Sequence, residues 1–88
     1  MRGNGIYEIR IMIKETVEFR KRIFSKGKAV KLFQQIPKAF NKIKFPEIFL
    51  IQNDFNNKNI QTSSVILLKN RININKMNLE QVKNLLEL

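Results

Sequence analysis

Apolar and polar residues alternate along the first part of the chain. Apolar side chains occupy every second position from Tyr7 to Ile13, and most residues between them are charged. A period of two is typical of a β-strand with one buried face. Val17 and Phe19 begin a second such pattern that extends toward Ile23 and Phe24. A helix over 15–24 is the alternative interpretation of this second segment.

The clearest helical pattern spans residues 28–44, directly after the break at 25–27. Its apolar residues recur at intervals of three or four and so share one stripe of a helix: Val30, Phe33, Ile36, Phe40 and Ile43. Four lysines of the segment fall on the opposite stripe: Lys28, Lys31, Lys38 and Lys42. Pro37 predicts a kink or a local break, and Phe45-Pro46 is expected to end the helix.

The rest of the chain predicts three further strands and a last helix. Residues 47–52 form a buried apolar segment, and the Asn-rich residues 53–59 suit a loop. Residues 62–69 are expected to form a strand that turns at Asn70-Arg71 into a short strand over 72–75. Asn78 is expected to cap the last helix, with Gln81 in the capping-box position.

These elements predict an α/β fold with the order β(β)-α-β-β-β-α. We expect a thioredoxin-like mixed sheet of about four strands with two main helices. The first β-α-β step is expected to give a parallel pair with a right-handed crossover. At 88 residues the chain is long enough for one domain only. We assign residues 11–88 to that domain and residues 1–10 to an N-terminal extension.

The positive charge of the chain is large and unevenly distributed. The formal net charge is +10. Residues 1–44 contain twelve Lys and Arg against three acidic residues, whereas residues 45–88 contain five against four. This excess predicts an anionic partner, nucleic acid first and an anionic membrane surface second. One half of the protein is expected to face that partner, and the other half to face the core or neighbouring proteins.

Composition excludes several kinds of chemistry. The chain has no Cys and no His, which removes disulfides, zinc sites of the usual kind, thiol redox chemistry and the commonest general base. No apolar run exceeds four residues, whereas a membrane span needs about 20. No removable targeting segment is evident at the N-terminus. We therefore expect a protein that is not an enzyme, with no cofactor, metal, small-molecule substrate or membrane span.

The basic residues of the first half are the candidate RNA-binding residues. Lys and Arg contacts to phosphates provide affinity without sequence readout. The alternative is that the lysine stripe is only the solvated face of an amphipathic helix. Phe33, Phe40 and Phe49 are assigned to the core and not to base stacking. The predicted RNA-binding residues are Arg10, Lys14, Arg20, Lys21, Arg22, Lys26, Lys28, Lys31, Lys38 and Lys42.

Several short motifs resemble a known group of proteins. Gly27-Lys-Ala-Val-Lys-Leu-Phe-Gln-Gln-Ile-Pro37, followed by Pro46-Glu-Ile48, is similar to a pattern in a thioredoxin-like mitochondrial group. The group contains one small-subunit and one large-subunit ribosomal protein and the B-eight subunit of respiratory complex I. Residues 11–19 and 77–86 resemble the first strand and the last helix of that group.

This resemblance implies a structural protein of the mitochondrial ribosome, in the small subunit rather than the large one. It would lie in the matrix and contact ribosomal RNA and other ribosomal proteins. Three alternatives stay open. The chain could be a complex I accessory subunit of the same fold, a free-standing nucleic-acid-binding module such as a phage or plasmid regulator, or a small basic toxin nuclease.

Overall fold

The computed structural model of the chain describes residues 5–39 and 44–87, which form four strands and two helices. The elements follow one another as β1 (Gly5–Ile13), β2 (Thr16–Ile23), α1 (Lys26–Gln35), β3 (Glu47–Phe55), β4 (Gln61–Arg71) and α2 (Leu79–Leu86). The predicted α/β class, with about four strands and two main helices, is confirmed. Residues 5–10 belong to β1, so the sheet begins within the segment that the sequence assigned to an N-terminal extension.

The strands lie side by side in the order β2-β1-β3-β4, and every neighbouring pair is antiparallel. The predicted parallel pair, and with it the mixed sheet, is wrong. A two-residue turn at Lys14 and Glu15 folds β2 back along one edge of β1. The connection through α1 then brings β3 to the other edge of β1. β2 and β3 therefore run in the same direction, but β1 lies between them.

Two further predictions about strands have different outcomes. β2 confirms a strand over residues 16–23 and excludes the helical alternative for 15–24. The short strand predicted over 72–75 is wrong, because β4 continues through Arg71 and residues 74–76 form a turn. Ile72 makes only an isolated bridge with Lys38. Its side chain is completely buried, which explains the apolar pattern there without a strand.

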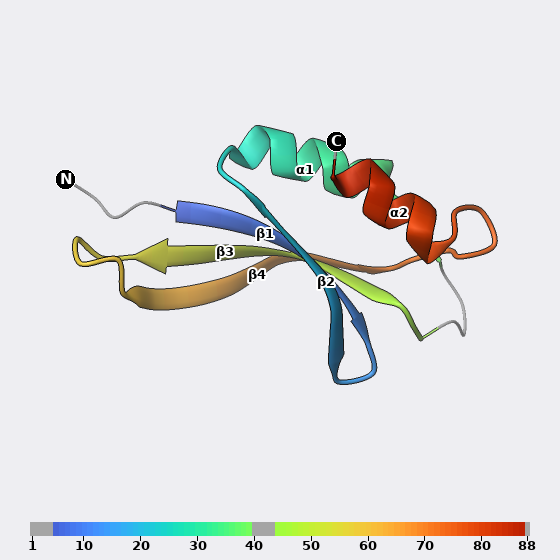
Figure 1. Ribbon diagram of the computed structural model, residues 1–88, viewed down its shortest axis with the longest axis horizontal. Helices are drawn as coiled ribbons and strands as arrows, with labels where there is room; N and C mark the ends of the chain where they lie inside the picture. Colours follow the sequence, from blue (N-terminus) through green and yellow to red (C-terminus); the bar gives the residue numbers. More distant parts are fainter. Residues whose placement is uncertain (1–4, 40–43, 88) are drawn as a thin grey trace.

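Both helices lie on the same side of the sheet and cover the core (Figure 1). Ile9 and Ile11 of β1 are completely buried beneath them, as the alternation of residues 7–13 predicted. Ile48 and Leu50, their partners on β3, are buried on the same face. The helices add Ala29, Phe33, Val82 and Leu86 to this core.

α1 is shorter than the predicted helix of residues 28–44. It ends at Gln35, and Ile36 has the extended ψ of 125° that a residue before proline favours. The break expected at Pro37 is thus the end of the helix. Lys38 consequently does not share a helical stripe with Lys28 and Lys31. The remaining lysine of that stripe, Lys42, lies outside the described residues.

The cap of α2 agrees with its sequence. Asn78 accepts a hydrogen bond from the Gln81 backbone at 2.8 Å, and the Gln81 side chain accepts one from the Asn78 backbone at 2.9 Å. These two bonds form the predicted capping box. Within residues 5–39 and 44–87, neither helix is long and apolar enough to cross a membrane.

Candidate nucleic-acid interface

The side of the sheet that faces away from the helices carries a row of basic residues. We call this side the open face. Arg10 of β1 is paired with Arg20 of β2 and with Phe49 of β3, and Phe49 is paired with Lys69 of β4. Residues paired directly across antiparallel strands share a face. Because Ile9 and Ile11 point toward the helices, Arg10 and this entire row point to the open face.

The neighbouring rows add two more basic residues. Arg22 is paired with Glu8, and Arg71 is paired with Glu47. The paired positions of the open face therefore hold five cations and two carboxylates, an excess of three positive charges. Those cations, the open-face cations, are Arg10, Arg20, Arg22, Lys69 and Arg71.

Glu8 orients Arg10 and lies close to Arg20 on the neighbouring edge strand. Arg10 Nε donates a hydrogen bond to Glu8 Oε2 at 2.7 Å, and Arg20 Nε lies 3.6 Å from the same oxygen. Asn53 Nδ2 donates to Glu8 Oε1 at 3.1 Å. Burial by itself would raise the pKa of Glu8, but the hydrogen bonds from Arg10 and Asn53 and the charges of Arg10 and Arg20 lower it below 4.5. Glu8 is therefore ionised at neutral pH and holds Arg10 in place.

Replacing Glu8 by glutamine is expected to lower the free energy of unfolding by about 1–3 kcal/mol at pH 7, because Arg10 loses its charged partner. The folded-state pKa lies below the ordinary value of 4.5, so this stabilisation is complete above pH 4.5 and is lost as the pH falls through the folded-state pKa. The difference between Glu8→Gln and the unmodified protein should therefore narrow below pH 4.5. Urea unfolding between pH 3 and pH 7 measures it.

Glu15→Gln is the matched control, because Glu15 is exposed in the β1–β2 turn. Its effect should stay within about 0.5 kcal/mol at every pH. A loss of stability in Glu8→Gln that is constant from pH 7 to pH 3 would contradict the assigned role of Glu8.

Phe49 supports the open face from below and is not available for base stacking. Its side chain is 9% exposed, and Lys69 Nζ lies 5.6 Å from the centre of its ring. The same ammonium group lies 3.5 Å from Glu47 Oε2, while the Lys69 side chain remains 58% exposed. Phe49 is buried, as predicted, but it lies under the basic row and not against the helices.

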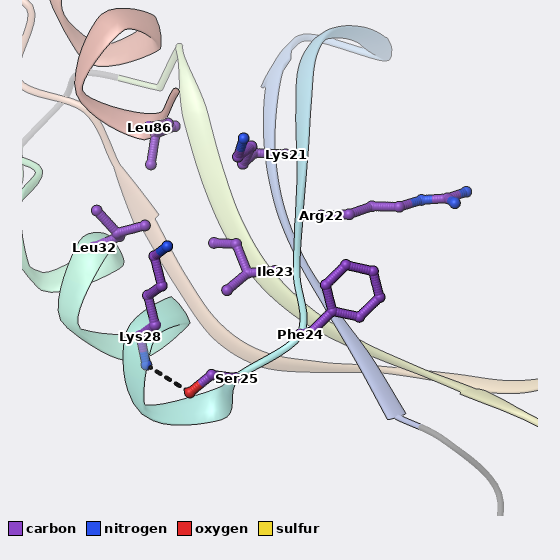
Figure 2. A pocket seen from close by; sticks show the side chains of 8 residues that line it. All are labelled: Lys21, Arg22, Ile23, Phe24, Ser25, Lys28, Leu32 and Leu86. Carbon is purple, nitrogen blue, oxygen red and sulfur yellow. Dashed lines mark hydrogen bonds between the residues drawn. The ribbon is translucent and has the colours of Figure 1, made fainter. Parts of the chain in front are cut away.

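A second group of cations lies on the helix side of edge strand β2. Lys21 extends from β2 toward the helices, and Lys28 extends from the first turn of α1 into the same space (Figure 2). They line a hollow of about 270 Å³ together with Ser25, whose hydroxyl accepts a hydrogen bond from the Lys28 backbone at 3.3 Å. Lys26 and Lys31 are exposed on the outer surface of α1.

The structure thus separates the predicted RNA-binding residues into groups. Arg10, Arg20 and Arg22 come together on the open face, whereas Lys21 and Lys28 line the hollow on the helix side of β2. Lys14 is exposed in the β1–β2 turn, and Lys38 is exposed near the end of β4, where it bridges to Ile72. The nine predicted residues that the structure describes therefore do not form one continuous site.

Sequence reasoning missed Lys69 and Arg71. Both lie in the half of the chain that has little net charge. The charge distribution assigned that half to the core or to neighbouring proteins and not to the RNA. The signal that could have found them is their spacing of two within a strand, which places both on one face. Only the pairing of β4 with β3 shows that this face is shared with Arg10.

Comparisons of the chain with protein-family models, curated proteins and solved structures found no match.

Proposed function

We propose that this chain is a non-catalytic RNA-binding protein whose open-face cations contact the phosphate backbone. The observation that carries the proposal is the row that crosses the sheet on the side away from the helices, with cations on β2, β1 and β4 and Phe49 on β3. Guanidinium and ammonium groups are the side chains that most often contact phosphates. The exposed side chains of Arg20 and Lys69 stand on opposite edge strands, so the row reaches from one edge of the sheet to the other.

The extent of the row favours a polymer over a small anion. Neighbouring strands are about 4.8 Å apart, so the outer members of the row are separated by about 14 Å at the backbone. A single phosphate group cannot span that width, whereas a nucleic-acid backbone offers phosphates at successive positions. RNA is the form of nucleic acid that we propose, following the ribosomal resemblance of the sequence.

The second half of the chain supports the proposal of protein neighbours. Among the described residues, most of the exposed large apolar side chains lie after position 44: Phe45, Ile60, Val65, Ile66, Leu68 and Ile74. Three of these belong to edge strand β4, which has an unpaired side in the described sheet. An exposed apolar edge strand is a surface on which another chain can pack.

The finer proposal is that the particle is the mitochondrial ribosome, in its small subunit, with the protein in the matrix. Its support is the set of motifs that resemble the thioredoxin-like ribosomal group, together with the basic open face. The antiparallel sheet gives no support to a thioredoxin-like arrangement, because that arrangement requires a parallel pair. The ribosomal proposal therefore depends on the motifs and the charge.

Sedimentation of an organelle lysate tests this finer proposal. At low magnesium and moderate salt, the protein should travel with the small ribosomal subunit. Migration with the respiratory complex would support the accessory-subunit alternative instead. Migration as free protein would contradict a ribosomal role and leave a free-standing nucleic-acid-binding module.

Salt dependence of RNA binding tests the general proposal. If all five open-face cations contact phosphates, the logarithm of the association constant should fall against the logarithm of salt concentration with a slope of about −3.5 on single strands. The slope should be about −4.5 if the nucleic acid is a B-form duplex. Fluorescence anisotropy of a labelled oligonucleotide measures this slope in titrations at about 50 to 300 mM salt, a range that includes the physiological ionic strength. A slope flatter than about −1 would contradict a multi-phosphate interface.

A further inference from the structure

Phe24 has an exposed aromatic ring in a strongly basic setting. Its side chain is 78% exposed, the largest value among the exposed large apolar residues of the described chain. Phe24 directly follows β2 and precedes Ser25, the N-cap of α1. Most of the other exposed apolar residues belong to β4 or to segments around Phe45 and Ile74. Phe24 is therefore isolated from them in the sequence and surrounded by basic neighbours.

The cations near Phe24 extend on both sides of the edge strand. Arg22 and the Phe24 ring extend on one side of β2, whereas Lys21 extends on the other side toward α1 and Lys28 (Figure 2). All four residues line the hollow at the β2–α1 junction, and none of the residues that line it is acidic. Within residues 5–39 and 44–87, neither Lys21 nor Lys28 takes part in an ion pair.

The exposed ring of Phe24 and the cations around it favour a ligand that has both a flat apolar group and negative charge. A solvent-exposed ring is stabilised when a flat, apolar partner covers it, and the surrounding cations require that partner to carry negative charge. A nucleotide supplies both, since its base can stack on a phenyl ring while its phosphates meet Lys and Arg. Bases in a duplex are already stacked and cannot do this, so the partner must be unpaired. An apolar protein surface would lack the charge that these cations favour.

We propose that the β2–α1 junction binds an unpaired nucleotide of single-stranded RNA, with its base stacked on Phe24 and neighbouring phosphates held by Arg22 and by the Lys21–Lys28 pair. The inference rests on the proposed RNA-binding function, because Arg22 belongs to the open face and the junction extends that interface around the edge of the sheet. It adds that the bound segment is single-stranded at this point.

A single tryptophan at position 24 tests the stacking directly. The chain contains no Trp, so Phe24→Trp introduces the only indole fluorophore. Three ligands are compared: oligo(U), an RNA duplex of matched charge, and inorganic polyphosphate, which has charge but no bases. We expect all three to bind through charge, and only oligo(U) to quench the tryptophan. Equal quenching by polyphosphate, or no quenching by bound oligo(U), would overturn the inference.

Affinity measurements on variants separate stacking from charge. Phe24→Ala should weaken oligo(U) binding by about tenfold and leave polyphosphate binding within about twofold. The double variant Lys21→Gln and Lys28→Gln should weaken both ligands, whereas Lys58→Gln with Lys76→Gln, away from the junction, should weaken both less. Unchanged oligo(U) affinity in Phe24→Ala would overturn the inference while leaving the proposed function intact. If none of the three ligands binds the unmodified protein, the proposed function itself fails and the inference fails with it.

Discussion

Replacing Arg22, Lys69 and Arg71 together by glutamine is expected to lower RNA affinity on the order of a hundredfold at about 50 mM salt. These three open-face cations lie on both edge strands, so their removal interrupts the interface on each side of Arg10. Each lost phosphate contact should also reduce the steepness of the salt dependence by about 0.7 on a single strand. The slope should therefore flatten by about 2, which anisotropy titrations at several salt concentrations would show.

The matched control removes the same charge elsewhere. Lys44, Lys58 and Lys76 are exposed and lie outside the paired strands of the sheet. Glutamine at these three positions lowers the net charge by the same amount and should reduce affinity much less. Equal losses in the two triple variants would show that total charge, and not the open face, determines binding. Urea unfolding of both variants checks that the fold is preserved.

Phe33→Ala is expected to have the largest effect on stability, a loss of about 3–5 kcal/mol. The Phe33 side chain is 2% exposed and joins α1 to the core beneath both helices. A domain of this size has a small total stability, on the order of 5 kcal/mol, so the variant should be largely unfolded at 37 °C. Far-UV circular dichroism during thermal and urea unfolding measures the change.

Phe24→Ala is the control for this experiment, because it removes the same side chain from an exposed position. Its free energy of unfolding should change by no more than about 0.5 kcal/mol. A similar loss in both variants would mean that Phe24 is packed in solution, and this result would also contradict its availability for a base.

The elements whose local pattern is unambiguous could be predicted from the sequence. The alternation of residues 7–13 placed Ile9 and Ile11 in the core, and the spacing of Asn78 and Gln81 defined the start of α2. The end of α1 was misplaced, because the apolar period continues past Pro37 although the proline stops the helix at Gln35. The spacing of apolar residues contains no information about the steric restriction that a proline imposes on the residue before it, so it does not predict where the helix ends.

The candidate site was predictable only in part, because some of its residues are distant in the sequence and meet only in the folded sheet. The basic residues of β1 and β2 are close in sequence and could be identified as a cluster. Lys69 is distant from Arg10 in the sequence and reaches the same face only through β3. Phe24 belongs to an apolar pattern that favours burial, but it is two residues after Arg22 and extends to the same side of β2, where it is exposed (Figure 2).

The sequence by itself determined that the chain is strongly basic, that it has no thiols or imidazoles, and that most of its strands and helices have one apolar face. Tertiary structure decided which of those cations lie together on one face of the sheet. Side-chain alternation assigns each residue to a face of its own strand, but strand order and register depend on contacts between distant segments. Here the antiparallel order β2-β1-β3-β4 aligns Arg20, Arg10 and Lys69 in one row on the open face. The basic row is therefore a property of the sheet and not of any one segment.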